Sequence, residues 1–253
     1  MSEFKLSLRS DIKDVTAKLS RIQRNQIPFA SAHAITKTAQ DVRTDLYRNM
    51  LRIFHEPVAY VVPKNIKEPR QKGSLYLVPA TKKKLEAEVY VKNLRFGKGN
   101  PAINFLAPHI ESGQRKTKGS EQSLRGRGVI GGGKYLTPST RSPYGHINLN
   151  RHGNVTKGTM NKVLSGLHSL RGLPSGSRSR QKSTYFAMPK KGGGTSTGIW
   201  ERRGKNLKKL FNVTDTPTYR KRFYFYRIAE ASAVRHFTRN FKKSLSYALA
   251  TAR

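Results

Sequence analysis

The spacing of apolar residues predicts helices near both ends of the chain. Residues 11–24 carry apolar side chains at steps of three and four, which is typical of an amphipathic helix. A second helix is expected to begin at Pro28, since proline suits a first helical turn, and to end near Arg52. The clearest pattern covers residues 224–253, where one apolar face is expected to pack in the core: Val234, Phe237, Phe241, Leu245, Ala248 and Ala252.

Alternating apolar and polar positions predict short strands between these helices. The best example is residues 85–91, where Ala87 and Val89 share one face while Glu86 and Glu88 share the other. The remaining expected strands cover residues 58–62, 185–188, 198–201 and 207–213, and residues 157–170 are expected to form a further helix. The chain from Pro63 to Pro79 is expected to form loops. This pattern predicts an α+β fold in which an antiparallel sheet is packed by long N-terminal and C-terminal helices, with extended basic loops or arms.

Charge changes this picture most. The chain of 253 residues has 50 Lys and Arg against 14 Asp and Glu, a formal net charge of +36. Self-repulsion of this size opposes compaction unless an acidic partner neutralises it. The apolar fraction of 36% is below that of a typical globular protein, so part of the chain is expected to lie outside the core.

The central part of the chain carries most of this imbalance. From Gln122 to Trp200 there is no Asp or Glu, while Lys and Arg occur 13 times. Glycine runs and a Ser/Arg/Gly tract in the same stretch are typical of flexible arms. We therefore expect residues 1–93 to form the helices and first strands of a core, residues 94–200 to be an inserted basic arm region, and residues 201–253 to complete the same core.

The sequence offers little for catalysis. Gly128 to Lys134 has the spacing of a phosphate-binding loop up to its lysine, but Tyr135 follows where that loop needs Ser or Thr. Glu86 and Glu88 could form a carboxylate pair, although exposed acids on a strand are far commoner. With no cysteine and scattered histidines, we expect no metal site, no cofactor and no enzymatic activity.

Nucleic-acid binding has better physical support, because Lys and Arg bind phosphates without regard to sequence and release counterions. No helix-turn-helix, zinc finger or other sequence-reading motif is present. An acidic surface on a neighbouring protein subunit would serve equally well as the neutralising partner. The cations expected to contact nucleic acid or a partner are Arg125, Arg127, Lys134, Arg178, Arg180, Lys182, Lys190 and Lys191.

Gln26 to Val42, with its Ala-rich helical pattern after Pro28-Phe29, resembles the opening of phage minor tail protein Z and of tail-completion proteins. Ile53 to Pro57, Pro79 to Lys82 and Leu149 to Asn154 are similar to pieces of phage virion proteins. The resemblance implies an α+β core, a ring of identical subunits, a role in joining or finishing the tail, and no catalytic residues.

Composition and resemblance together predict a structural protein of a bacteriophage virion, in the head-tail neck or the tail, assembled in the host cytoplasm. Its expected partners are copies of itself, other neck or tail proteins, and nonspecifically the exiting DNA. We expect no signal peptide and no membrane span, since no apolar run approaches the roughly 20 residues that a span needs. The alternatives are a ribosomal or chromatin-type nucleic-acid-binding protein and, less favoured, an enzyme acting on nucleic acid.

Overall fold

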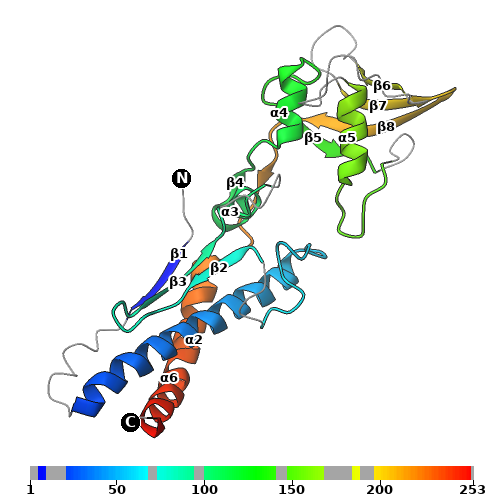
Figure 1. The fold of residues 1–253 in the computed structure, drawn as a ribbon. Coiled ribbons are helices and arrows are strands. Elements are labelled where there is room, and N and C mark those ends of the chain that lie inside the picture. Colours follow the sequence, from blue (N-terminus) through cyan, green and yellow to red (C-terminus); the bar gives the residue numbers. More distant parts are fainter. Residues whose placement is uncertain are drawn as a thin grey trace. The chain divides into compact units, whose positions relative to one another are not determined.

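The computed structural model describes residues 5–9, 21–67, 73–93, 100–140, 147–167, 184–188 and 197–251 (Figure 1). The chain divides into two compact units. Unit 1 comprises residues 1–112 and 220–253, and unit 2 comprises residues 113–219. Helices and antiparallel sheets together make an α+β fold, as the sequence predicted. Among the described residues, no helix combines the length and apolar character that crossing a membrane would require.

Unit 1 contains a three-stranded antiparallel sheet. Its strands are β1 (Lys5–Arg9), β2 (Leu75–Val78) and β3 (Glu86–Val91), in the order β1-β3-β2. The central strand β3 confirms the strand predicted at residues 85–91, and its Ala87 and Val89 are fully buried.

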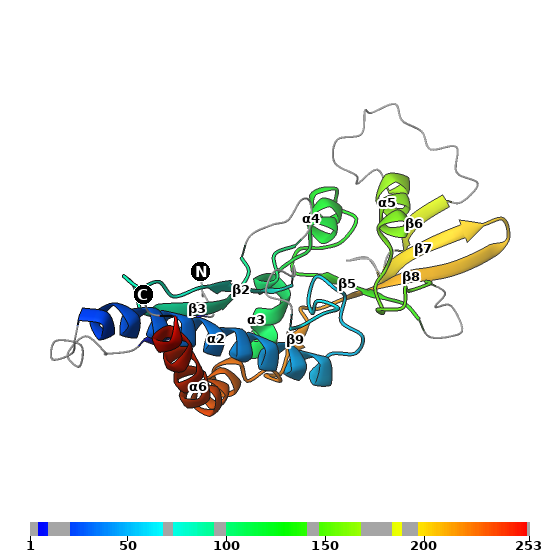
Figure 2. The ribbon, with the colours of Figure 1, turned by 60° about the horizontal axis from the view of Figure 1, so that its bottom comes forward.

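Three helices complete unit 1: α2 (Arg21–Ile53), α3 (Ile103–Glu111) and α6 (Phe225–Ala250). Helix α2 contacts β2 and β3, and α6 runs beside α2 (Figures 1 and 2). The predicted packing of the N-terminal and C-terminal long helices is confirmed. The core contains buried apolar residues from all three helices and the sheet, including Ile35, Leu46, Met50, Leu75, Val89, Leu106, Ile110, Phe223 and Phe225.

The predicted helix boundary at Pro28 is wrong. Pro28 lies inside α2, which already begins at Arg21. Proline lacks the N–H that would bond the carbonyl four residues earlier, so it usually interrupts a helix. Here the helix continues because the long segment after Pro28 is held by packing, with Ala30, Ala34 and Ile35 almost fully buried. Residues 21–24 of the predicted helix 11–24 belong to α2, and the rest of that prediction lies outside the described residues.

The strand predicted at residues 58–62 is also wrong, because this segment forms a turn. The amides of Val61 and Val62 both donate to the carbonyl of Val58, at 2.8 and 3.1 Å. The strand that follows α2 and pairs with β3 is instead β2, in the stretch expected to be loops. The Tyr47 hydroxyl fixes its start, since it accepts from the amide of Leu75 at 3.0 Å and donates to the same residue's carbonyl at 3.3 Å. Burial raises the pKa of Tyr47 to about 12, so the hydroxyl keeps its proton.

Helix α6 buries a different face from the predicted one. Val234, expected in the core, is 75% exposed, and Phe237 and Phe241 are only partly buried. The buried positions carry mostly small or polar side chains: Phe225, Ala229, Ser232, Ala233, Asn240, Ser244 and Ala248. Small residues allow close approach of α2, so helix packing overrides the larger apolar stripe. Of the predicted face, Ala248 is fully buried and Phe237 packs against the core while remaining partly exposed, whereas Val234 lies outside it.

Unit 2 is built around a four-stranded antiparallel sheet in the order β5-β8-β7-β6. Its strands are β5 (Tyr135–Pro138), β6 (Thr184–Met188), β7 (Gly198–Arg203) and β8 (Asn206–Thr214). Helices α4 (Gly119–Gly126) and α5 (Lys157–Gly166) pack on it, and β4 (Gly113–Gln114) pairs with β9 (Thr218–Tyr219). The predicted strands β6, β7 and β8 and most of the predicted helix 157–170 are confirmed; residues 168–170 lie outside the described part.

The structure divides the chain elsewhere than at residues 94 and 200. Helix α3 belongs to the core of unit 1, and strands β7 and β8 belong to unit 2 rather than to the core that α6 completes. The described part of residues 113–219 has its own hydrophobic core rather than the form of extended arms. The residues of this core are widely spaced in a basic sequence, so the composition of the segment did not indicate a core. They are Leu124, Ile130, Leu136, Ile147, Val163, Leu164, Ile199, Leu210 and Phe211.

Candidate functional site

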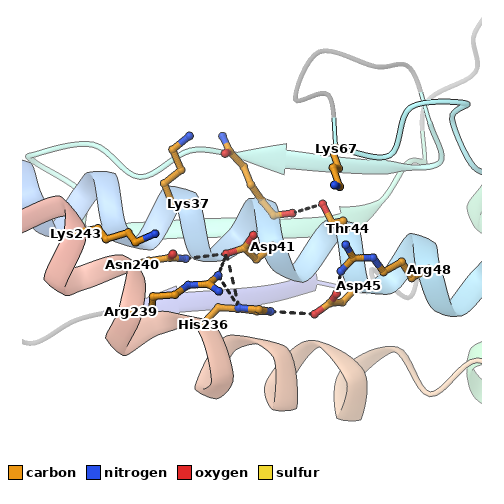
Figure 3. Close-up of a pocket in the computed structure, with 11 residues that line it drawn as sticks. Lys37, Asp41, Thr44, Asp45, Arg48, Lys67, His236, Arg239, Asn240 and Lys243 are labelled. Carbon is orange, nitrogen blue, oxygen red and sulfur yellow. Dashed lines mark hydrogen bonds and ion pairs between the residues drawn. The ribbon is translucent and has the colours of Figure 1, made fainter.

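A groove of ≈ 510 Å³ opens between α2 and α6 of unit 1 (Figure 3). Polar and charged side chains line it throughout. Those from α2 and the turn after it are Lys37, Gln40, Asp41, Thr44, Asp45, Arg48 and Lys67, and those from α6 are His236, Arg239, Asn240 and Lys243. Such a lining suits a charged ligand rather than an apolar one.

The floor of the groove is a set of polar contacts that join the two helices. Asp45 accepts from the Ser232 hydroxyl at 2.7 Å, from Arg48 at 2.6 Å and from Nε2 of His236 at 3.2 Å. Burial opposes ionisation of this carboxyl, but the three donors outweigh it and hold the pKa of Asp45 below its ordinary value. Asp45 is therefore a satisfied anion that fastens α6 to α2.

Asp41 lies one turn earlier in α2 and makes the matching contacts. It accepts from the Asn240 amide at 2.8 Å and from Arg239 at 3.4 Å. Arg239 also lies 2.9 Å from Nδ1 of His236. Because arginine can only donate, Nδ1 must accept, and the proton of the neutral ring is then on Nε2, which donates to Asp45. Figure 3 shows these contacts as one continuous network.

Positive charge remains after these pairs are formed. The groove carries five cations, Lys37, Arg48, Lys67, Arg239 and Lys243, against the two carboxylates, so its formal charge is 5 − 2 = +3 with His236 neutral. The side chains of Lys37, Lys67 and Lys243 are exposed. A groove of this kind attracts phosphate or carboxylate groups on a partner.

In unit 2, Glu121 organises a second cluster. Its side chain is 1% exposed and forms a bidentate ion pair with Arg115, at 2.5 and 2.9 Å. The carboxylate also accepts from the amides of Lys118 at 2.8 Å and Leu136 at 3.0 Å. Burial opposes its ionisation, but these donors hold the pKa of Glu121 below its ordinary value. Four hydrogen bonds satisfy one buried anion, which ties α4 to the first strand of the sheet.

Arg125, expected to contact a partner, is held inside this cluster. Its guanidinium lies 4.9 Å from the Tyr135 ring centroid, with Arg115 4.6 Å from the same centroid. Arg125 also donates to the carbonyl of Lys134 and to the hydroxyl of Thr117. These contacts give Arg125 a structural role, because a partner would have to displace them.

The other predicted contact residues are spread out. Lys134 pairs with Asp215 at 2.5 Å, and Asp215 is 91% exposed, so this pair lies at the surface. Arg127 is exposed at the end of α4. The remaining five lie outside the described residues: Arg178, Arg180, Lys182, Lys190 and Lys191. Contact of these cations with nucleic acid or a partner stays a prediction.

The geometry of the glycine-rich loop differs from that of a phosphate-binding loop. The segment from Gly128 to Lys134 joins α4 to β5, so a strand follows it where nucleotide binding needs a helix N-terminus. Gly128 and Gly133 have φ values of 69° and 71°, which fit tight turns between the two elements.

Glu86 and Glu88 lie on one face of β3, as predicted, but lysines neutralise them. Lys84 lies 3.6 Å from Glu86 and 3.5 Å from Glu88, and Lys5 lies 2.6 Å from Glu88. The Glu86 side chain is 9% exposed and that of Glu88 is 13% exposed, so these are shielded carboxylates paired with lysines and not the exposed acids expected from the sequence. Within the described ranges, no group of three or more potential metal-ligating side chains occurs.

The groove was not predicted from the sequence, because Asp41 with Lys37 and Asp45 with Arg48 have the spacing of ordinary ion pairs on an exposed helix side. The Asp45–Arg48 pair does form, but both carboxylates also bind α6. A signal was present: Ser232, His236, Asn240 and Ser244 recur every fourth residue of α6. A polar stripe at helical spacing, beside aspartates four residues apart, indicates a polar seam between two helices.

The chain matches no protein-family model, no curated protein and no solved structure.

Proposed function

We propose that this chain is a structural subunit of a tailed-phage virion, located in the head-tail neck or tail. In this proposal it binds copies of itself and neighbouring neck or tail proteins, and its cationic surfaces meet the exiting DNA or acidic protein surfaces. The proposal includes no catalytic step. The proposal is supported by the segment Gln26 to Val42, which resembles the opening of minor tail proteins and tail-completion proteins.

The charge surplus carries the proposal. The acidic side chains that could balance it are few, 14 in the chain, and several are already used to hold the fold together. Asp45 fastens α6 to α2, Glu121 is buried against Arg115, and Glu88 pairs with lysines. Neutralisation of the remaining cations therefore has to come from outside the chain.

Exposed apolar side chains in unit 1 favour protein partners in addition to a polyanion. Val234 and Tyr247 on α6 are 75% and 56% exposed, and Leu51 near the end of α2 is 51% exposed. Tyrosine side chains are enriched in subunit interfaces, whose buried centres are more apolar than the rest of a protein surface. A subunit that binds both proteins and DNA would use such residues beside its cations.

The test is the composition of the particle. Phage particles purified from the source that encodes this chain should contain it at a fixed copy number, and an antibody to it should label the head-tail junction or the tail. Particles that lack the chain but package DNA and infect normally would overturn the proposal. A monomer found on ribosomes or on cellular DNA instead would favour the ribosomal or chromatin-type alternative.

A further inference from the structure

One face of the unit 2 sheet carries aromatic rings in a row. Phe186 in β6 lies opposite Trp200 in β7, and Trp200 lies opposite Lys209 in β8. Side chains opposite each other in antiparallel strands point to the same face. The adjacent row, Ala187, Ile199 and Phe211, points the other way, where Ile199 and Phe211 pack in the core with α4 and α5.

Two cations lie over these rings. The Lys209 ammonium is 5.6 Å from the Trp200 ring centroid, and the Arg202 guanidinium is 5.6 Å from that of Phe186. Gly198 leaves room for this arrangement, because a Cβ there would come within 2.6 Å of Cε of Lys209. Both rings remain partly exposed. The face therefore offers flat aromatic surfaces with positive charge directly above them.

The hairpin that carries Trp200 is predominantly basic. Residues 198–214 contain five cations, Arg202, Arg203, Lys205, Lys208 and Lys209, and one carboxylate, Glu201. Glu201 lies opposite Tyr185, whose hydroxyl donates to it at 3.3 Å, and Tyr185 packs against the core. The carboxylate thus belongs to the helix-covered side, and the described strands β6, β7 and β8 present no acid on the aromatic face.

We infer that this face of unit 2 binds single-stranded nucleic acid. Bases stack on Phe186 and Trp200, and Arg202 and Lys209 move from the rings to the phosphates of the same strand. An exposed cation–π contact is weaker than base–aromatic stacking, so this exchange favours binding. A duplex offers the same phosphates but keeps its base faces stacked on each other, so it cannot use the rings.

This inference goes beyond the proposed function and does not depend on a place in a virion. The cations expected from the sequence to contact nucleic acid did not include Arg202 or Lys209, and the sequence alone indicated no role for Trp200 or Phe186. The pairing of the four residues follows from strand register, with a bulge between Ile199 and Trp200 that sets their order.

Trp200 is the only tryptophan of the chain, so its fluorescence reports on this face alone. The full chain is titrated with an eight-nucleotide oligo-dT, with a duplex of equal phosphate count, and with polyglutamate. We expect saturable quenching of tryptophan emission by oligo-dT and little quenching by the duplex or polyglutamate at matched charge. Equal quenching by all three, or none by oligo-dT, contradicts stacking.

Variants provide an independent reading through the anisotropy of a labelled oligo-dT. Phe186→Leu should weaken binding about ten-fold. Arg202→Gln with Lys209→Gln should lower the slope of log affinity against log salt by about 0.7 for each lost phosphate contact. The matched control, Lys157→Gln with Lys162→Gln, removes the same charge from exposed positions on α5.

Circular dichroism first establishes that each variant is folded. The inference is overturned if the sheet-face variants and the α5 control lose affinity equally, because binding would then follow net charge and not this face. It is also overturned if Phe186→Leu binds oligo-dT as tightly as the unchanged chain.

Discussion

Replacement of Glu121 by Ala should destabilise unit 2 more than any surface change. The substitution leaves Arg115, whose side chain is 11% exposed, without its counter-ion, and it leaves the buried amide of Leu136 without its acceptor. Breaking a buried ion pair from one side costs about 3–5 kcal/mol, and an orphaned amide costs about 1–3 kcal/mol. Since the two penalties share one relaxation of the structure, we expect a total loss of about 4–5 kcal/mol.

Urea unfolding followed by Trp200 fluorescence measures this loss, because the only tryptophan lies in unit 2. Circular dichroism in the same samples reports on the long helices of unit 1, which should be unaffected. Asp215→Asn is the control: it removes a carboxylate that is 91% exposed, and the unfolding midpoint should not move. A Glu121→Ala midpoint within error of the unchanged chain would refute the structural role of this cluster.

The same carboxylate predicts a pH dependence. Burial raises its pKa, but the Arg115 and backbone hydrogen bonds outweigh burial and lower the folded-state pKa below the ordinary value of 4.5. Its contribution to stability is therefore complete above about pH 4.5 and is lost as pH falls through the folded-state pKa. Glu121→Gln should reduce the fall in the free energy of unfolding of unit 2 at acid pH, measured by tryptophan fluorescence. If the fall is the same in the variant, groups other than Glu121 cause it.

Three further predictions concern unit 1 and the basic tract. Gly73→Ala should destabilise unit 1 by about 1–3 kcal/mol in thermal unfolding, because the new Cβ would collide with the Tyr47 hydroxyl that holds β2; equal melting temperatures would contradict this packing. On α6, Ala229→Asp should lower the free energy of unfolding by more than about 3 kcal/mol, since Ala229 is fully buried. Val234→Asp should change it by less than about 0.5 kcal/mol, and equal losses for the two variants would show that Val234 also packs in the core. Replacing Arg178, Arg180 and Lys182, which lie outside the described residues, by neutral residues should leave folding intact but impair virion assembly or DNA retention. Normal infectivity of the variant would count against a role of this basic tract in either.

Strand periodicity predicted much of the architecture. In β3 the alternation places Ala87 and Val89 in the core from one face and puts Glu86 and Glu88 together on the other face, as expected, although Glu86 is itself buried at 8% exposure. Strands β7 and β8 were predicted by the same reasoning, but their pairing as one hairpin was not. Strands of this kind are predictable because burial of one face requires a period of two.

Helix limits and helix faces were less predictable, because tertiary contacts decide them. Pro28 predicts a helix start by local chemistry, yet α2 continues through it under the packing of its later turns. On α6, close contact with α2 selects Ala229 and Ser232 over the bulkier Val234. Which face of a helix packs depends on how the side chains of both helices fit together, and the sequence pattern of one helix alone does not reveal this.

The two candidate surfaces differ in what the sequence could reveal. The groove depends on contacts between polar residues of α2 and α6 that are far apart in the sequence, such as Asp45 and Ser232, which are 187 positions apart. The aromatic face depends on the register of three strands, which a bulge shifts by one residue. Net charge indicated a polyanionic partner, but only the fold locates cations beside aromatic rings.

The salt dependence of DNA binding by the full chain tests the central claim most directly, namely that the charge surplus is neutralised from outside. Binding of a labelled DNA fragment is measured at salt concentrations from about 50 to about 400 mM, a range in which counterion release is measurable. The logarithm of the affinity should fall linearly with the logarithm of the salt concentration, with a slope of several units. A chain that stays monomeric and binds DNA no more tightly at low salt than at high salt would contradict the account.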